Sequence, residues 1–268
     1  MKLLLFSGTH PRHLYVNKEV LKYFDDCLVI IMEREKLIPK PPIDICNRDK
    51  QNFEKHFKNR EIKEYKAFKK LNYLDVYKGK KQICVTPDKL NSLKLATQVE
   101  KFDADICFIF GTNLILSPVI DLLPKNKINL HLGLSPWYKG AATLFWPFYF
   151  LEPQFAGITF HQITKKADQG KIIHQSVPNL EYGDTIHDVG VKCIINAKKE
   201  IKKLINHFKK NKSFDGKIQF SSGRLWRVKD FHPSQLRVIY NLFNDDIVDK
   251  YLDGQLNKEK PKIYSCLQ

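Results

Sequence analysis

The sequence has few arginines, no closely spaced cysteines and no long apolar run. Its six cysteines, at positions 27, 46, 84, 107, 193 and 266, never form a C-x-x-C pair, so zinc-site and thioredoxin spacings are missing. No segment approaches the ~20 apolar residues that span a membrane. The apolar run at residues 3–6 is too short for a secretion signal. We therefore expect reduced thiols, a cytoplasmic protein and no membrane partner.

Basic residues outnumber acidic ones by 45 to 29 in a chain of 268 residues, which gives a formal net charge of +16. Such a charge is typical of proteins that bind nucleic acid. However, nearly all the basic residues are lysines, whereas bidentate recognition of phosphate prefers arginine. Nucleic acid is thus the less favoured partner, and we expect small anionic ligands instead.

Continuous apolar strands alternate with helical patterns along most of the chain. The expected strands are 2–6, 27–32, 105–110, 128–132, 156–163 and 171–177. The expected helices begin at residue 11 or cover 88–102, 117–123, 142–151 and 184–211. This alternation predicts an α/β, Rossmann-like fold, with a mostly parallel central sheet flanked by helices. Binding sites in such sheets lie at the carboxyl ends of the strands.

Two segments depart from the alternation. Residues 34–86 are expected to be an insertion that is irregular at first and then helical over 49–71, where three phenylalanines have helical spacing and the charges face solvent. Residues 213–223 suggest a linker or hairpin, followed by two short helices near Pro233 and Asp245. We therefore expect a main domain at 1–212 and a small C-terminal appendage at 213–268.

Asn129 and His131 stand two residues apart at the end of an expected strand, so their side chains lie on the same side of it. A carboxamide and an imidazole held in this way are suited to binding an oxygen that gains negative charge. Alone, the pair would more simply be an ordinary structural histidine with an incidental asparagine. The irregular loop that follows, from Gly133 to Gly140, should fold over the strand end.

A second polar cluster occurs in the segment Gly157 to Ile173. Thr159 and His161 face the same way on the expected strand, and Asp168 follows seven residues after His161, in a turn that ends at Gly170. An aspartate before glycine is most often a turn former when taken alone.

Together these segments resemble the folate-dependent formyltransferase family, which includes glycinamide ribonucleotide, methionyl-tRNA and sugar N-formyltransferases. The resemblance covers about residues 87–190. Its core is Asn-x-His followed by His-x6-Asp-x-Gly, and four segments carry it: Gly111 to Pro118, Ile128 to His131, Tyr138 to Gly140 and Gly157 to Ile173.

The resemblance implies that Asn129, His131 and Asp168 are the catalytic residues of a transfer from 10-formyltetrahydrofolate to an amine. Asn129 and a protonated His131 would stabilise the negative charge on the formyl oxygen. Asp168 would keep His131 charged and move a proton. Neither a metal nor a covalent enzyme intermediate is expected.

The resemblance also implies binding residues on both sides of this trio. Those expected to hold the folate are Asn113, Leu114, Ile115, Leu116, Thr164, Lys165 and Lys166. Those expected to hold the acceptor are Gly8, Thr9, His10, Arg12, His13, Gly133, Tyr138, Lys139 and Gly140. Two positions depart from the family pattern: Leu114 replaces a basic or polar residue of some relatives, and Gly133 replaces a serine.

The appendage makes the chain longer than glycinamide ribonucleotide enzymes, and it is too short for the C-terminal barrel of methionyl-tRNA enzymes. The expected acceptor is therefore a nucleotide-linked amino sugar, such as a GDP- or dTDP-linked 4-amino-4,6-dideoxyhexose used in lipopolysaccharide O-antigen, and a homodimer is possible. The alternatives are a methionyl-tRNA formyltransferase-like enzyme, a formyltetrahydrofolate hydrolase, and a non-catalytic RNA-binding or scaffold protein.

Overall fold

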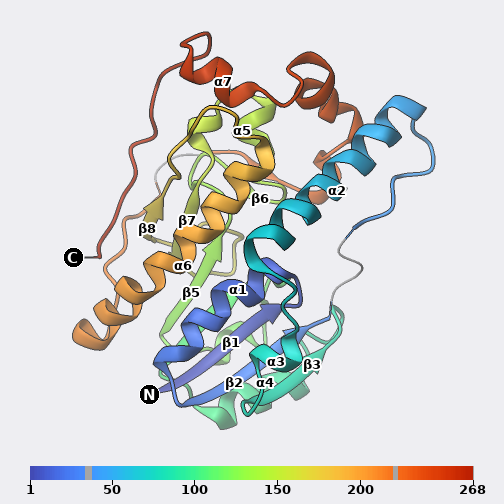
Figure 1. The fold of residues 1–268 in the computed structure, drawn as a ribbon. Coiled ribbons are helices and arrows are strands. Elements are labelled where there is room, and N and C mark those ends of the chain that lie inside the picture. The colour runs from blue at the N-terminus through green and yellow to red at the C-terminus, as the bar shows by residue number, and fades with distance from the viewer. Residues whose placement is uncertain (34–37, 220–222, 268) are drawn as a thin grey trace.

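The computed structural model describes residues 1–33, 38–219 and 223–267. A seven-stranded sheet with the order β3-β2-β1-β4-β5-β7-β8 forms its centre (Figure 1). The strands are Lys2–Gly8 (β1), Asp26–Met32 (β2), Lys81–Val85 (β3), Ile106–Phe110 (β4), Asn126–His131 (β5), Ile158–Gln162 (β7) and Ile172–Ser176 (β8). Strands β1 to β5 are parallel, whereas β7 and β8 are antiparallel to their neighbours. The predicted α/β fold with a mostly parallel sheet is confirmed.

Helices cover both faces of this sheet. They are Pro11–Val20 (α1), Asn47–Phe68 (α2), Tyr73–Val76 (α3), Leu93–Phe102 (α4), Trp146–Tyr149 (α5), Ile186–Asn211 (α6) and Ile247–Leu252 (α7). A separate two-stranded pair joins Lys139–Gly140 (β6) to Leu225–Trp226 (β9). In the described parts of the chain, no helix has both the length and the apolar character needed to cross a membrane.

The side chains of β1 show how the two faces are covered. Leu3 and Leu5 belong to the core that contains buried residues of α1, α2 and α6, whereas Leu4 and Phe6 belong to the core that contains those of α4. Successive side chains of a strand point to opposite faces, so an uninterrupted apolar strand is buried on both. Figure 1 shows the long α6 lying across the same side of the sheet as α1.

Helix starts follow local capping chemistry. Thr185 and Asp188 form a capping box at the start of α6, as the Asp-Thr pair before the helix suggests. The predicted helix over 88–102 begins later, at Leu93, because the Ser92 side chain accepts a hydrogen bond from the Leu95 amide at 3.3 Å. Two other predicted helices are shorter than expected: 117–123 contains only a 3-10 turn at Ile120–Leu122, and 142–151 contains only α5.

The sequence analysis assigned no strand to residues 34–86, and this is wrong at 81–85. Here β3 pairs in parallel with β2 and forms the edge of the sheet. Because it is an edge strand, Lys81, Gln82 and Cys84 are exposed and only Val85 is buried, so an apolar run is missing. Residues 34–37 of the same segment lie outside the described residues.

The C-terminal residues pack closely against the main domain. His174 of β8 contacts the Ser265 hydroxyl at 2.8 Å, and the Gln175 amide donates to the Tyr264 carbonyl at 2.8 Å. Short 3-10 turns occur at Val228–Asp230 and Pro233–Gln235 before α7. The described residues of 213–267 therefore share a core with residues 1–212, although the domain division itself stays a prediction. Residues 220–222 of the expected linker are outside the described part.

Candidate active site

The strand pairing at one end of the sheet brings two polar side chains together. Strand β7 runs antiparallel to β5, with Asn129 opposite His161 and His131 opposite Thr159. The Asn129 Nδ2 and His161 Nε2 atoms are 3.1 Å apart. The predicted placement of Asn129 and His131 at a strand end is confirmed, because β5 ends at His131.

Asp168 joins this pair to His131. Its Oδ1 lies 3.2 Å from His161 Nε2, and its Oδ2 lies 3.5 Å from His131 Nδ1. The Gly140 amide donates a hydrogen bond of 2.7 Å to the same Oδ2. One carboxylate thus links two imidazoles and a loop amide, and Asn129 completes a compact polar cluster on the second imidazole.

The Asp168 carboxyl is strongly acidic. Burial alone would raise its pKa, but the neighbouring His131 and the hydrogen bond from His161 outweigh burial and hold the pKa below the ordinary aspartate range. The Gly140 amide acts in the same direction. Asp168 is therefore an anion at neutral pH and is suited to balancing positive charge beside it.

His131 sits in a tight backbone frame. Its Nε2 donates to the Tyr138 carbonyl at 2.8 Å, and its side chain is buried. A Cβ added at Gly133 would lie 2.4 Å from that Nε2, so this glycine leaves room for the ring. Burial lowers the pKa of His131, and Asp168 and the Tyr138 carbonyl offset this only in part. Burial thus favours the neutral form of His131 in the structure as it stands, and the protonated His131 that the resemblance implies stays a prediction.

The proton arrangement on His161 follows from its neighbours. Its Nδ1 lies 2.8 Å from the Gln162 carbonyl, which only accepts, so Nδ1 carries a proton. Its Nε2 can then take one of two roles. Either it accepts a hydrogen bond from the Asn129 amide, or it carries a second proton and donates to Asp168. His161 had been recognised only as part of the motif, and the structure brings it into direct contact with Asn129 and Asp168.

A cavity of about 430 Å³ opens beside this cluster. Of the residues expected to hold the folate, five line it: Asn113, Leu114, Ile115, Thr164 and Lys166. Two others do not: Leu116 is partly exposed and Lys165 pairs with Asp121 at 2.8 Å. The wall also contains Gly111, Thr112, Ile163 and Ala167, which the sequence analysis did not assign to binding.

The residues expected to hold the acceptor divide among several places. His13 and Gly140 line the cavity beside the cluster, and Arg12 lines a second cavity. The remaining six line neither: Gly8, Thr9, His10, Gly133, Tyr138 and Lys139. Among these, Tyr138 supports His131 through its carbonyl, and Tyr138 itself donates from its hydroxyl to Glu152 at 2.8 Å.

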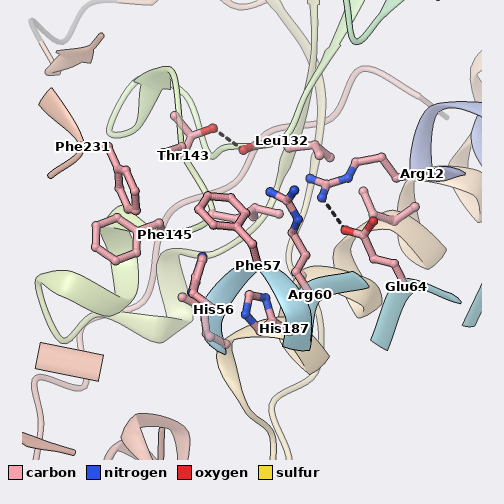
Figure 2. A pocket seen from close by; sticks show the side chains of 15 residues that line it. Arg12, His56, Phe57, Arg60, Glu64, Leu132, Thr143, Phe145, His187 and Phe231 are labelled. Carbon is pink, nitrogen blue, oxygen red and sulfur yellow. Dashed lines mark hydrogen bonds and ion pairs between the residues drawn. The ribbon is translucent and has the colours of Figure 1, made fainter. Parts of the chain in front are cut away.

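The second cavity, of about 260 Å³, adjoins the first one, since Leu132, Ala142 and Thr143 line both. Figure 2 shows side chains of α1 and α2 together with Phe145, His187 and Phe231 around it. Four of its wall residues come from one side of α2: His56, Phe57, Arg60 and Glu64. The sequence analysis assigned the charges of this helix to solvent, but Glu64 is only 6% exposed.

Two buried histidines form part of this second wall. Tyr240 places its hydroxyl 2.9 Å from His56 Nδ1 and 3.3 Å from His187 Nε2. Burial lowers the pKa of His187 to about 3, and the charges of Arg60 and Arg12 act in the same direction. Burial also holds the pKa of His56 well below its ordinary value. Both rings are therefore neutral at neutral pH.

Metal ligation has no candidate in the part of the chain that the structure describes, where no group of three or more His, Cys, Asp or Glu side chains is arranged to hold an ion. The polar cluster instead offers an amide, two imidazoles and one carboxylate within hydrogen-bonding or ion-pairing distance of one another. Such a set can bind a polarised oxygen and move a proton without a metal.

Several known proteins are similar to this chain. The bifunctional polymyxin resistance protein ArnA of Wigglesworthia glossinidia brevipalpis is 34% identical over 127 residues, which cover 47% of this chain and only 19% of that protein. A sugar N-formyltransferase from a Shewanella species has 17% sequence identity and a TM-score of 0.56 over 86% of this chain and 78% of its own.

A third similar protein is the N-formyltransferase from Helicobacter canadensis, solved with folinic acid and dTDP-3-aminofucose. It has 17% identity and a TM-score of 0.51, over 87% of this chain and 73% of its own. At these identities the two structures establish the shared fold. The model of the formyl transferase family matches residues 36–205, which is more than half of the chain. The chain therefore belongs to the formyl transferase family.

Proposed function

We propose that this protein transfers the formyl group of 10-formyltetrahydrofolate to the amino group of a nucleotide-linked amino sugar. The observation that carries the proposal is the cluster of Asn129, His131, His161 and Asp168 on the wall of the larger cavity. This cluster supplies the hydrogen-bond donors and the anion that formyl transfer to an amine requires.

The reaction balances with a single donor and a single acceptor. A bond forms between the acceptor nitrogen and the formyl carbon, and the bond from that carbon to the folate nitrogen breaks. One proton leaves the acceptor amine, and one reaches the departing folate nitrogen. The protein therefore has to stabilise the charged oxygen and to move one proton, and no redox partner is needed.

Asn129 and His131 are suited to those two tasks. The Asn129 amide has two N–H groups, and His161 Nε2 can accept from at most one of them, so at least one can donate to a formyl oxygen. Because burial lowers the pKa of His131 and so favours an imidazole that can accept a proton, we assign it the proton released by the amine. Asp168, 3.5 Å from His131 Nδ1, would balance the resulting charge.

The formyl donor fits the wall formed by Asn113, Leu114 and Ile115 on one side and by Thr164 and Lys166 on the other. Leu114 is 44% exposed although it lines a cavity, which is expected where a flat ring covers an apolar side chain. Lys166 would suit the carboxylates of a folate tail. Binding of folinic acid by the Helicobacter canadensis relative supports this assignment.

For the acceptor, we infer a GDP- or dTDP-linked 4-amino-4,6-dideoxyhexose or a related 3-amino sugar. We infer that it is formylated in the cytoplasm and then used to build surface polysaccharide. The dTDP-3-aminofucose bound by the Helicobacter canadensis relative supports the nucleotide sugar class. The second cavity supports it too, because it gives an extended acceptor room next to the catalytic cluster.

The test is mass spectrometry of candidate acceptors incubated with the protein and 10-formyltetrahydrofolate. The panel holds GDP- and dTDP-linked 3-amino and 4-amino sugars, glycinamide ribonucleotide and methionyl-tRNA. We expect one formyl mass gain on a nucleotide sugar, formed about 10²–10⁴ times more slowly by the Asp168→Asn variant. Formylation of methionyl-tRNA alone, or release of formate without an acceptor, would overturn the proposal in favour of a tRNA enzyme or a hydrolase.

A further inference from the structure

The second cavity is built for a ligand that also reaches the catalytic cluster. Leu132, Ala142 and Thr143 line both cavities, and the Thr143 hydroxyl donates to the Leu132 carbonyl at this junction (Figure 2). A volume of about 260 Å³ is small for a whole ligand, since binding pockets span roughly 300–1,000 Å³. A molecule bound there would therefore extend past the junction toward Asp168 or out of the cavity mouth.

Positive charge gathers on one side of this cavity. Figure 2 shows the guanidinium groups of Arg12 and Arg60 next to each other near Leu132. Their permanent charges face a single lining carboxylate, Glu64, which pairs with Arg12. Burial and the charge of Arg12 together lower the pKa of Arg60 to about 10. Glu64 and Glu61 offset part of the charge of Arg60, but only Glu64 lines the cavity. A wall with two partly buried guanidinium groups and one carboxylate favours an anionic ligand.

Aromatic rings form the other side. Phe145 and Phe231 meet edge to face with centroids 4.9 Å apart, and Phe57 lies 6.4 Å from Phe231. The Arg60 guanidinium stacks over the Phe57 ring at 4.6 Å, so the cationic and aromatic sides are continuous. Such rings bind flat heteroaromatic groups by stacking and by edge contacts. The neutral His56 and His187 border the same side.

We propose that this cavity binds the nucleoside diphosphate part of the acceptor, with the diphosphate at Arg12 and Arg60 and the base against Phe57 and Phe231. Arginine provides paired donors that match phosphate oxygens, and the aromatic side provides the surface for a base. The linked sugar would then pass Leu132 and Thr143 to present its amine to His131 and Asp168. This assignment rests on the proposed function for the direction in which the sugar points.

Binding measurements test the cavity without requiring turnover. Isothermal titration calorimetry of the full chain with GDP, dTDP, UDP and inorganic pyrophosphate should show binding of at least one nucleoside diphosphate. Arg60→Gln should weaken it by roughly 10- to 100-fold, the usual worth of a charge-assisted hydrogen bond. The matched control is Arg48→Gln, which removes an exposed arginine from the same helix and should leave binding unchanged.

A second variant separates the base from the phosphates. Phe231→Leu should weaken binding of the nucleoside diphosphate and leave pyrophosphate binding unaltered. Folinic acid binding, measured in parallel, should be the same in every variant, which verifies that each one is folded. Equal nucleotide affinity in Arg60→Gln and Arg48→Gln, no nucleotide binding by the unmodified protein, or tighter binding of an RNA oligonucleotide would each overturn the assignment.

The two proposals fail in different ways. If a nucleotide sugar is formylated while Arg60→Gln keeps its KM, the proposed function stands and the cavity assignment is wrong. If nucleoside diphosphates bind in an Arg60-dependent manner but no nucleotide sugar is formylated, the cavity assignment stands and the proposed function is wrong.

Discussion

Trp226 stacks on Trp146, with ring centroids 3.8 Å apart and ring planes inclined by 16°. The Trp226 carbonyl also accepts a hydrogen bond of 2.8 Å from the Ala141 amide. Gly140, which precedes Ala141, donates a hydrogen bond from its amide to Asp168. The C-terminal segment thus supports the loop that holds the catalytic carboxylate, so its packing matters for activity as well as for stability.

Trp226→Ala should therefore lower both the stability and the catalytic activity of the protein. Removing a buried tryptophan typically costs about 3–5 kcal/mol of unfolding free energy, which urea denaturation would measure. The kcat of the remaining folded protein should also fall, because the support of Gly140 is weakened. Trp226→Phe keeps an aromatic ring and should lose much less. A Trp226→Ala protein as stable as the unmodified one would show that the stacking contributes little.

Asp168→Asn tests the charge of the cluster with little change in shape. Asp168 has a φ of +50°, a backbone conformation that asparagine tolerates well, so the fold should be kept. The kcat should fall by about 10²–10⁴, the usual contribution of a positioned acid or base. Asp121→Asn is the control, since Asp121 is exposed and forms an ion pair with the surface residue Lys165. Near-normal kcat in Asp168→Asn would refute its role.

Gly133→Ala should damage the site through crowding. Its Cβ would meet His131 Nε2 at 2.4 Å and the Tyr138 carbonyl at 2.7 Å, so the imidazole has to move. We expect a fall in kcat of at least about tenfold, as small displacements of catalytic groups are costly. In Gly183→Ala, by contrast, the new methyl group meets no atom within 4 Å, and Gly183 lines neither cavity. That control should keep its kcat, although the φ of +81° at Gly183 should cost roughly 1–2 kcal/mol of stability.

The buried histidines predict a loss of stability in acid. The pKa of His187 is lowered to about 3 and that of His56 is also lowered, so the unfolded chain binds more protons than the folded one below pH 6.5. Each such group should reduce the unfolding free energy by up to about 1.4 kcal/mol per pH unit as the pH falls below that value.

Urea denaturation between pH 7.5 and pH 5 would measure this slope. His187→Gln removes one of the titrating groups, so its stability should depend less steeply on pH than that of the unmodified protein. Unchanged slopes in the two proteins would contradict a neutral, buried His187.

The catalytic trio was accessible from the sequence because its spacing resembles the formyltransferase family pattern. The side chains of Asn129 and His131 follow the two-residue period of β5, and the His-x6-Asp spacing reaches from β7 to the next turn. The lowered pKa of His131 was not accessible, because the pattern contains no measure of burial. The role of His161 was missed for a related reason: its partner across the sheet depends on an antiparallel pairing that no local pattern indicates.

The second cavity was almost invisible in the sequence. Arg12, Arg60, His187 and Phe231 come from four distant segments, and only the fold brings them to one place. A partial signal was present in α2, where His56, Phe57, Arg60 and Glu64 follow helical spacing and mix charge with an aromatic ring. Charges on the exposed face of a helix are common and do not indicate a binding site. The pattern therefore predicts a site only once the helix is known to face α6. The possible homodimer stays a prediction.

The pairing of β5 with β7 fixes the distance between two residues of the catalytic cluster. Because backbone hydrogen bonds align Asn129 with His161, their separation does not depend on the length or sequence of the chain that connects the two strands. That connecting segment contributes Thr143 and Phe145 to the second cavity. Substitutions in the walls of the second cavity could therefore change which acceptor is bound while the catalytic groups keep their spacing. This applies to evolution within the family and to protein engineering alike.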